Sequence, residues 1–576
     1  MRCLVYMSQI HSLSISHFRG IREFKVENLP KLVCLIGRGD SGKSTVLEAI
    51  NLVLSSNWNV AFFDNDFFNC DTNKPIIIEA TIINIPEELM NESKFGLYLR
   101  GYDTQTGQIL DDPALADDIA LTIRLQILRD LEPTWSVVTN TEKGIRSINA
   151  ADRSRLNAFL VSDYVDRHFS WSKGSPLYSL LKQELRIEED DILLEVLREA
   201  KAKIDSGTFS KFEHVVTKVK ATAQSFGIDI SGTASTIDFK DIVMKDGKMS
   251  LHDNTIPFRL KGKGSKRLVS VTIQSLIAGS GGIVLIDEIE QGLEPDRVQH
   301  LVNTLKQNND GQVFMTTHSR DVLVELKAVD LFLMAKGNNH LTRFTQDLQG
   351  ALRKNPECFF ARKVIVCEGA TEIGICRALN HYRTGNEQTN ISYLGVRFAD
   401  GSGSQFFEYA KGFKKSNIPV CVFCDKDAKG AKETAAQKSK INELIKLGVP
   451  VFEWEAGDCI ETGVFKEVPF AAIIEMCGLA GKLLADQFNI TIELSMEKIK
   501  TAIGSKLGRK IENEINTEED STELRLAIGT IASNQSWFKS QDKGFEWGQI
   551  IFRYINELPQ GRLKTNIEEL NKWIDQ

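Results

Sequence analysis

Hydrophobic and polar residues alternate along this chain in short runs whose spacing changes from region to region. Between residues 9 and 85, apolar runs such as HSLSISHF, FKVENL, KLVCLIG and PIIIEATIINI predict β-strands, and TVLEAINLVLSS predicts a helix between them. Residues 86–174 are less regular, with strand-like runs in DIALTIRLQIL and PTWSVVT. From Leu177 to about Ala223, apolar and charged residues recur at helical spacing, which predicts long amphipathic helices.

Two regions of alternating strands and helices follow. Residues 283–350 contain the strand-like runs IVLID, QVFMTT and LFLMA, and a second such region begins at Lys363 and ends near Phe452. This alternation is typical of sheets covered by helices. The remaining residues are mainly helical, with an exposed loop expected at NEINTEEDSTE. The pattern predicts an α/β chain with a helical tail.

Length, charge and cysteine content narrow the class of protein. The 576 residues suggest three to five domains at about 150 residues each. The net charge of −7 excludes a uniformly basic coating protein but allows a local basic stripe. No apolar run approaches the roughly 20 residues that span a bilayer, so we expect no membrane contact. Ten dispersed cysteines suit a reducing cytoplasm, and Cys421 and Cys424 fit the core of a strand.

Residues 37–44, GRGDSGKS, match the phosphate-binding loop pattern G-x-x-x-x-G-K-[ST] and lie between a predicted strand and a predicted helix. In such a loop, backbone N–H groups and the helix N-terminus surround phosphates. Lys43 is expected to reach the β- and γ-phosphates, and the Ser44 hydroxyl to bind Mg²⁺. The rest of the predicted ATP-binding set is Gly37, Asp40, Ser41, Gly42 and Thr45.

Two further strands end in residues that suit nucleotide hydrolysis. The run IVLI is followed by Asp287, expected at the Mg²⁺ shell, and Glu288, expected to orient or deprotonate the attacking water. The strand QVFMTT is followed by His318. Upstream of both lies GKGSKRL, residues 262–268.

The order of these motifs resembles the ATPase head of ABC and SMC proteins. The resemblance places GKGSKRL at the signature motif, although it departs from the usual Ser-Gly-Gly, and assigns Gly264 to a phosphate bound on a partner head. It also places His318 at the switch histidine. No glutamine is evident for the Q-loop, where Asp66 is either a substitute or a plain loop residue. A homodimer or higher homo-oligomer is implied, with residues 175–225 as a helical dimerisation insert.

Acidic residues follow two strands of the C-terminal half. Glu368 follows the strand KVIVC, and Asp425 and Asp427 follow the strand PVCVFC. Because the carboxyl ends of neighbouring parallel strands converge, these side chains are expected to meet there. Clustered carboxylates require a cation, and oxygen ligands suit Mg²⁺ or Mn²⁺. The alternative is two helix-capping acids and an exposed turn.

Together these acidic motifs resemble a Toprim domain, and a head followed by Toprim is the layout of the OLD (overcoming lysogenisation defect) nucleases. The phrase VCEGATE is similar to that family's VEGxTE. The resemblance implies two-metal phosphodiester hydrolysis with Glu368 as general base. The metal ligands that it implies are Glu368, Glu372, Asp425, Asp427, Asp458 and Glu461.

The resemblance also implies a lysine that stabilises charge on the scissile phosphate, for which Lys539 fits best and Lys543 is the alternative. Asp400, in FADGSG, is either near the metals or part of an Asp-Gly turn. DNA is the expected substrate. About half of a group of lysines is expected to contact the DNA backbone. The other lysines are expected to lie on a solvated helix face. The group consists of Lys411, Lys414, Lys415, Lys426, Lys429, Lys432, Lys438 and Lys440.

The predicted domains are residues 1–174 and 226–355 for the head, 175–225 for its insert, 356–475 for Toprim and 476–576 for the helical part that completes the nuclease site.

The leading hypothesis is an ATP-regulated endonuclease in anti-phage defence. The resemblance extends to the Gabija nuclease, which has a helicase partner, and to retron effectors controlled by a reverse transcriptase and its msDNA. The alternatives are a topoisomerase-like enzyme and an ATP-switched DNA-binding scaffold.

Overall fold

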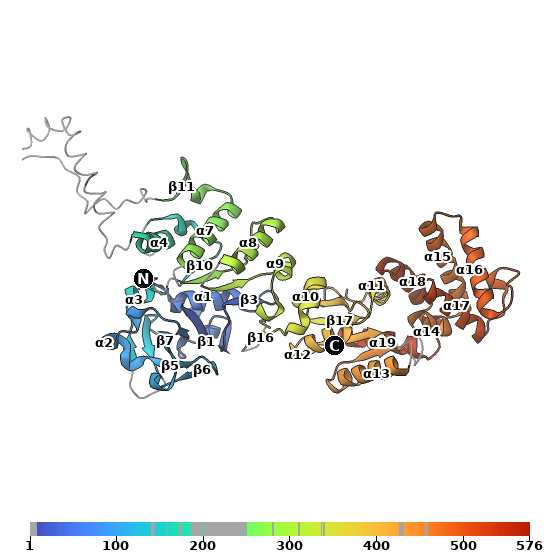
Figure 1. Cartoon of the computed structure of the whole chain (residues 1–576), viewed down its shortest axis with the longest axis horizontal. Coiled ribbons are helices and arrows are strands. Elements are labelled where there is room, and N and C mark those ends of the chain that lie inside the picture. The colour runs from blue at the N-terminus through green and yellow to red at the C-terminus, as the bar shows by residue number, and fades with distance from the viewer. Residues whose placement is uncertain are drawn as a thin grey trace, which may run out of the picture.

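A computed structural model of the protein describes most of the chain. The described residues are 8–139, 145–156, 158–171, 175–185, 199, 250–278, 282–308, 311–335, 337, 340–425, 431–454 and 459–576. They form an elongated arrangement in which an N-terminal two-sheet head, a smaller α/β domain and a group of helices follow one another (Figure 1). Most of the predicted insert, and Asp427 and Asp458, lie outside the described residues. No helix in the described part is long and apolar enough to cross a membrane.

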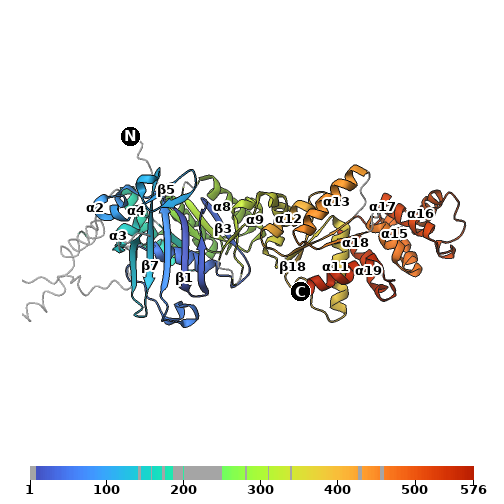
Figure 2. The same ribbon diagram turned by 90° about the horizontal axis from the view of Figure 1, so that it is seen from below.

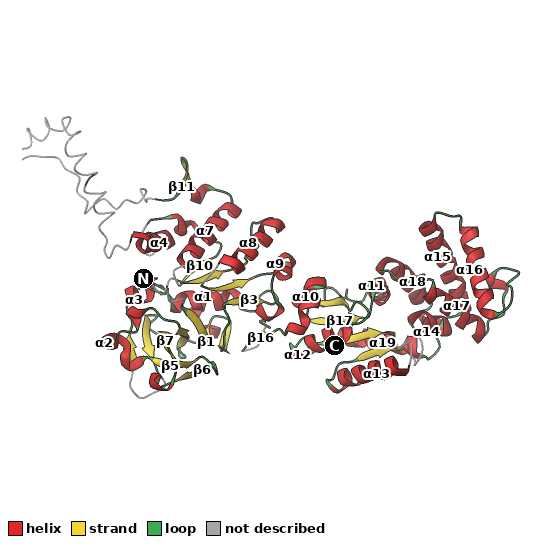
Figure 3. Cartoon of the chain, viewed as in Figure 1, coloured by secondary structure: helices red, strands yellow, loops and turns green. Residues whose placement is uncertain are grey.

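The first sheet of the head is antiparallel and has the order β2-β1-β4-β7-β5-β6, with β8 paired to β7 and β9 to β8. Its long strands coincide with the apolar runs of the sequence (Figure 3). The strands are β1 (Gln9–Phe18), β2 (Ile21–Val26), β4 (Ile76–Ile83), β5 (Arg100–Asp103), β6 (Gln108–Leu110), β7 (Asp118–Ile127), β8 (Pro133–Val138) and β9 (Ile145–Ser147).

The second sheet has the order β10-β13-β14-β3-β15-β16 and is parallel except for β16. Its strands are β10 (Ala158–Val161), β13 (Ile283–Ile286), β14 (Gln312–Thr316), β3 (Leu32–Ile36), β15 (Leu331–Leu333) and β16 (Thr342–Arg343). Helix α1 (Lys43–Val53) shares one apolar core with both sheets, through Leu47, Ile78 of β4 and Phe314 of β14. The carboxyl ends of β3, β13 and β14 therefore meet beside the start of α1.

Helices of the head cover the other face of the parallel sheet. They are α7 (Lys263–Ala278), α8 (Pro295–Asn308) and α9 (Arg320–Glu325), and their apolar residues belong to one core with that face. The short helix α4 (Pro176–Leu185) belongs to the predicted helical insert and contributes Leu177 to the same core. The hairpin β11 (His252–Asp253) and β12 (Ile256–Pro257) precedes α7.

The second domain is built on a parallel sheet of order β18-β17-β19-β20, in which the strands are β17 (Lys363–Cys367), β18 (Val396–Asp400), β19 (Val420–Cys424) and β20 (Val451–Glu453). Alternate residues of β17 enter different cores: Val364 and Val366 join one, and Ile365 and Cys367 the other. Helices α12 (Phe406–Lys415) and α13 (Ala431–Lys446) lie on the first face, and α11 (Ala370–Gly385) lies on the second (Figure 2). Cys421 and Cys424 are buried, as expected of core thiols.

The core on the first face is continuous with that of the head. It runs from Leu323 of α9 through α10 (Gln349–Lys354) and Phe359 to Phe413 of α12. The head and the second domain are therefore joined by packed side chains.

The C-terminal helices share one apolar core with the second face of the small sheet. They are α14 (Ile460–Glu467), α15 (Phe470–Phe488), α16 (Ile492–Leu507), α17 (Thr522–Asn534), α18 (Gln541–Arg553) and α19 (Arg562–Asp575). The contact of α11 with α18 is close because glycines face backbone: a Cβ on Gly374 would lie 2.6 Å from the carbonyl oxygen of Gln541. At the other end of α11, Arg383 pairs with Asp575 of α19. The observed architecture confirms the expected α/β class with a helical tail.

We expect Gly374→Ala to destabilise the protein, because the added methyl group meets backbone atoms that have no room to move. An overpacked interior site costs about 1–3 kcal/mol, so thermal unfolding should begin several degrees lower. Gly478→Ala is the matched control: its Cβ would meet nothing within 4 Å, and Ala favours helix over Gly. Equal melting temperatures for both variants in calorimetry would contradict the close α11–α18 contact.

Candidate functional site

The phosphate-binding loop has the conformation that its glycines permit. Gly37 and Gly42 have φ values of +152° and +96°, and a Cβ on either would collide with Met334 after β15. Both positions therefore require glycine for backbone conformation and for space. The loop leads directly into α1, and the N-terminus of this helix faces a cavity.

A cavity of about 350 Å³ lies at the carboxyl edge of the parallel sheet. Its lining includes every loop residue predicted from Asp40 to Thr45, together with Gly39, Glu288, Thr316 and His318. The Lys43 ammonium donates to the carbonyl oxygens of Gly37 and Arg38, both at 3.0 Å. Burial lowers the pKa of Lys43, and the charges of Asp287 and Glu288 oppose that shift. A cationic group inside a loop of N–H donors suits a triphosphate.

The predicted magnesium residues of the head lie together. The Ser44 hydroxyl donates to Asp287 Oδ1 at 3.0 Å, and the Thr316 hydroxyl donates to the same oxygen at 2.6 Å. The backbone N–H of Glu288 donates to the Thr316 hydroxyl at 2.7 Å. Glu288 has a φ of +48°, which turns its exposed side chain toward the cavity lining. The hydroxyl and carboxylate oxygens are hard ligands that fit a divalent cation beside the phosphates.

Three residues that the motif analysis passed over hold this arrangement. Thr316 bridges Asp287 and Glu288 as described. Glu290 accepts from the His318 backbone N–H and from the Thr317 hydroxyl, both at 2.7 Å, and so places His318. Arg267, in the GKGSKRL segment, donates to the carbonyl oxygen of Glu288 at 2.7 Å and to that of Asp287. The sequence shows only that an arginine lies in this segment, and the partners of that arginine are distant in the chain.

Gly264 and Asp66 do not line the cavity in this chain. Gly264 lies at the start of α7 against Gly292 of the GLEPDR segment, where a Cβ would be 2.5 Å from the Gly292 oxygen. Asp66 accepts from Arg19 Nε at 2.9 Å and from the Phe63 backbone N–H at 3.1 Å. These contacts favour the structural alternative for Asp66. Gly264 lies outside the lining of the cavity that the phosphate-binding loop forms.

In the second domain, four of the predicted acids come together at the carboxyl ends of the parallel strands. Glu368 follows β17 and accepts from the Asp425 backbone N–H at 2.9 Å, across from β19. Glu372 lies in the first turn of α11 and accepts from the Gly369 N–H at 3.0 Å. Glu461 lies in the first turn of α14 and is 1% exposed. Helices α11 and α14, on the second face of the sheet, thus add two buried carboxylates to the two that the strands bring together.

The acidic cluster (Glu368, Glu372, Asp425 and Glu461) contains two carboxyl groups, those of Glu372 and Asp425, whose pKa values are raised. Burial raises the pKa of Glu372 to about 8, and the charges of Glu368 and Glu461 add to the shift. Burial, followed by the charges of Glu372, Glu368 and Glu461, raises the pKa of Asp425 well above its usual range. Each carboxylate therefore raises the cost of ionising its neighbours.

The donor set fits a hard divalent cation chemically. The buried Asp425 Oδ1 has no hydrogen-bond partner among the described residues, and a cation would coordinate it. Within that described part, no group of three or more His, Cys, Asp or Glu side chains has the geometry of a formed metal site. Asp427 and Asp458, the other two predicted ligands, lie outside it. The cluster thus holds four of the six predicted ligands.

The two candidate lysines differ in their surroundings. Lys539 is exposed, in a segment held against α11 by the Thr371 hydroxyl, which donates to the Phe538 carbonyl oxygen at 3.2 Å. Lys543 donates instead to Gln487 of α15 at 2.9 Å. Glu372 is the next residue after Thr371, so the contact brings the Lys539 segment to the helix turn that carries a cluster acid.

Asp400 ends β18 and is paired with Lys354 at 2.9 Å. Its Oδ1 also accepts from the Ser402 N–H at 2.8 Å, as in an Asp-Gly turn. Both carboxylate oxygens therefore have structural partners, although the residue lies one strand from Glu368.

Part of the lysine-rich surface has local partners. Lys411 pairs with Glu443 at 2.5 Å, Lys415 pairs with Asp347 at 3.6 Å, and Lys440 lies over the Phe407 ring. For these three, the solvated helix face is the better interpretation. Lys426 and Lys429 lie outside the described residues, as does the side chain of Lys432.

Two family models match the chain in the order that the motifs indicate. The family described as "AAA domain, putative AbiEii toxin, Type IV TA system" matches residues 32–325, about half of the chain. The family described as "Overcoming lysogenization defect protein-like, TOPRIM domain" matches residues 359–427. The chain belongs to the OLD family of ATPase–Toprim proteins. Its head is an ATPase domain that binds ATP, and the second domain is Toprim, a type that binds divalent metal.

Individual relatives are more distant. An ATP/GTP phosphatase of Helicobacter pylori is 22% identical over 362 residues, which cover 58% of this chain and 91% of the relative. Among solved structures, an SMC head bound to the winged-helix domain of ScpA has 15% identity and a TM-score of 0.32, covering 56% of this chain and 93% of that one. The recombination mediator RecF has 14% identity and a TM-score of 0.31, covering 59% and 99%. The fold assignment rests on the sheet orders and the two family matches.

We expect Glu372→Gln to stabilise the metal-free protein near pH 8. The folded-state pKa of Glu372 is raised from 4.5 to about 8, so stability that is fully present below pH 4.5 is lost as pH rises toward 8. The amide keeps the acceptor for Gly369 but carries no charge. In calorimetry with EDTA, the melting temperature of the variant minus that of the wild type should grow across this window.

Added Mg²⁺ or Mn²⁺ should raise the melting temperature of the wild type more than that of the variant, because a cation relieves repulsion between charged ligands. Glu546→Gln, on the exposed face of α18, is the control and should follow the wild type. A Glu372→Gln curve parallel to the wild type at every pH would contradict the buried cluster.

Proposed function

We propose that this OLD family member is a divalent-metal-dependent DNA endonuclease whose cleavage is regulated by ATP and which acts in anti-phage defence. The observation that carries the proposal is the buried acidic cluster on a Toprim sheet joined to an ATPase head by a continuous core. A buried set of mutually repelling carboxylates costs stability, and holding metal ions is the use that offsets this cost.

Metal ions bound there would activate water and stabilise the leaving oxygen of a phosphodiester. Glu368 is the proposed general base, with one oxygen held by the Asp425 N–H and its backbone carbonyl fixed by the Gly403 N–H at 2.8 Å. Lys539 is the proposed cation for the charge that develops on the scissile phosphate, because it lies in the segment against α11 and is exposed.

Support for regulation by ATP comes from two contacts between the nucleotide cavity and the Toprim domain. His318 lines the cavity, and its ring centroid lies 6.2 Å from that of Phe360, which precedes β17. Arg38, in the phosphate-binding loop, lies against Gly395, which precedes β18. We propose that phosphate binding shifts these two residues and thereby the strands that carry Glu368 and Asp400. The name of the Helicobacter relative, ATP/GTP phosphatase, is consistent with nucleotide turnover in the head.

The proposal includes a homodimer in which Gly264 of one head approaches the nucleotide of the other. The position of Gly264, away from its own cavity and at the start of α7, is the support. A helicase subunit or a reverse transcriptase with its msDNA is the class of partner that the Gabija and retron resemblances suggest.

In a plasmid assay, we expect wild-type protein with Mg²⁺ or Mn²⁺ to convert supercoiled DNA to nicked and linear forms, and Glu368→Ala to be slower by on the order of 10²–10⁴-fold because it lacks the general base. Gel densitometry over time, with and without ATP, measures both rates. Glu546→Ala should retain the wild-type rate. If the wild type nicks no plasmid with either metal, with or without ATP, the endonuclease proposal is wrong.

The same variant measures the biological part of the proposal. Cells expressing the wild type should resist phages in a panel that infect cells expressing Glu368→Ala. Equal protection by both would separate defence from cleavage and favour an ATP-switched scaffold.

We expect Lys539→Ala to reduce cleavage on the order of 10²–10³-fold at unchanged oligonucleotide affinity, as for loss of a group that stabilises the transition state. Lys543→Ala should stay within about threefold of the wild type, because that side chain is bound to Gln487. Single-turnover rates of a labelled duplex measure the difference. A larger loss at Lys543 would reverse the assignment.

A further inference from the structure

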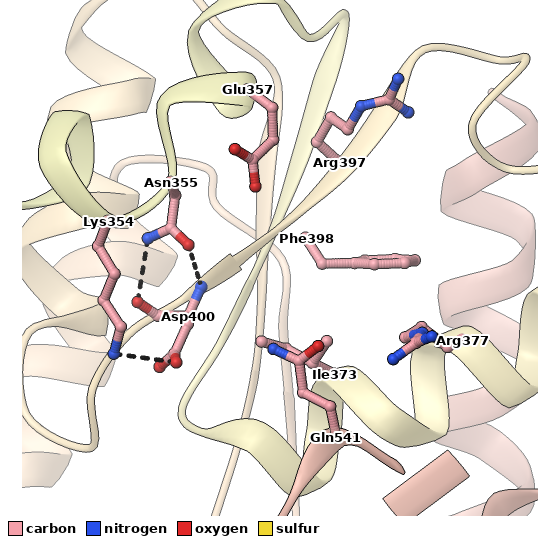
Figure 4. Close-up of a pocket in the computed structure, with 9 residues that line it drawn as sticks. All are labelled: Lys354, Asn355, Glu357, Ile373, Arg377, Arg397, Phe398, Asp400 and Gln541. Atoms are coloured by element: carbon pink, nitrogen blue, oxygen red, sulfur yellow. Dashed lines mark hydrogen bonds and ion pairs between the residues drawn. The ribbon is translucent and has the colours of Figure 1, made fainter. Parts of the chain in front are cut away.

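A second cavity of about 320 Å³ lies beside the acidic cluster, on the side of the edge strand β18. Three parts of the chain line it: the end of the head, the Toprim residues of α11 and β18, and the first residue of α18 (Figure 4). Its size is at the lower end of the range for small-ligand pockets. None of the predicted metal ligands lines it.

The cavity has a positive excess of charge. Arg397 of β18 donates to the Val396 carbonyl oxygen at 3.2 Å and faces no carboxylate at ion-pair distance in the described part of the chain. Arg377 of α11 lies over the Phe545 ring at 5.8 Å and pairs with Asp542 at 3.4 Å, and the Asp542 side chain is 91% exposed and therefore binds it weakly. The acids of the lining are already compensated, Asp400 by Lys354 at 2.9 Å and Glu357 by Arg320 at 3.6 Å. Two guanidinium groups therefore remain for an anion.

An aromatic ring accompanies these cations. Phe398 of β18 is half-buried, and Figure 4 shows its ring extending into the cavity, with Arg397 above it and Arg377 below it in that view. Gln541, at the start of α18, adds an amide at the lower rim. Guanidinium groups bind phosphate, and aromatic rings stack on nucleobases without regard to sequence. The combination suits a nucleoside phosphate.

The cavity is close to the cleavage site through shared elements. Asp400 pairs in register with Cys367, the residue before Glu368. The loop after β18 binds back to that strand end, because the Gly401 N–H donates to the Cys367 carbonyl oxygen and the Gly403 N–H donates to the Glu368 carbonyl oxygen, both at 2.8 Å. Helix α11 carries Glu372 of the cluster and, one residue later, Ile373 of the cavity lining.

We propose that this cavity binds one nucleotide unit of the DNA strand next to the nucleotide that is cleaved, with the base on Phe398 and the two phosphates that flank that nucleotide on Arg397 and Arg377, one on each side of the ring. The proposal rests on the proposed endonuclease function and names how the same site holds its substrate. A free nucleoside monophosphate has the same chemistry, and the experiment distinguishes the two sources.

The experiment measures binding without cleavage, by anisotropy of a short labelled single-stranded oligonucleotide with full-length protein in EDTA. Arg397→Ala should weaken binding roughly tenfold and Phe398→Leu about fivefold, the latter by removing the stacking surface while keeping an apolar side chain. Arg553→Ala, about 18 Å further along α18, removes the same charge outside the cavity and should bind as the wild type does. Matching melting temperatures check that each variant is folded.

A second arm titrates thymidine 5′-monophosphate as competitor. Displacement of the oligonucleotide only at concentrations far above the oligonucleotide Kd supports a strand site, whereas tighter binding of the mononucleotide than of the strand overturns it. Unchanged oligonucleotide affinity in both Arg397→Ala and Phe398→Leu also overturns the proposal. Because binding is measured without metal, a cavity that binds the strand in a protein that cuts no plasmid would leave this inference standing while the endonuclease function fails.

Discussion

Repulsion between carboxylates that are held together out of water is the constraint on which the Toprim half depends. Parallel strands deliver Glu368 and Asp425 to one edge, and α11 and α14 add Glu372 and Glu461. Burial makes each charge more costly, and the raised pKa of Glu372 is the measure of that cost. Helix α11, which carries Glu372, is held by glycine contacts with α18 and by the Arg383–Asp575 pair at its far end. The repulsion within the acidic cluster and the close packing of α11 therefore involve the same helix.

In the head, the ends of parallel strands bring together opposite charges rather than like charges. Its parallel strands also end at one edge, but there a buried lysine lies among acids and hydroxyl groups, so the charges attract. The bridging hydroxyl of Thr316 and the guanidinium of Arg267 fix the acidic turn after β13. A shared apolar core then sets the position of the Toprim sheet relative to this edge. Packing thus couples two charged edges, one attractive and one repulsive.

Residues in local motifs could be predicted from the sequence. The strand before GRGDSGKS, the acids after IVLI and the glutamate after KVIVC all lie where the order of apolar runs and glycines indicates. Residues whose role depends on a distant partner could not. Glu290 holds His318 across two strand ends, and Lys543 donates to Gln487, a residue of another helix. Arg397 and Phe398 belong to no motif, because their cavity is assembled from three separate parts of the chain.

The sequence by itself determined the two parallel sheets, the loop that surrounds phosphates and the acids that follow the strands. These follow from hydrophobic period, glycine placement and the rule that parallel strands end together, all of which are local in the chain. Only the tertiary structure decided which acids are buried, which lysine is bound to another side chain and how the arginines beside β18 are paired. Burial and charge pairing depend on atoms contributed by residues tens to hundreds of positions apart, and the spacing of a motif carries no information about them.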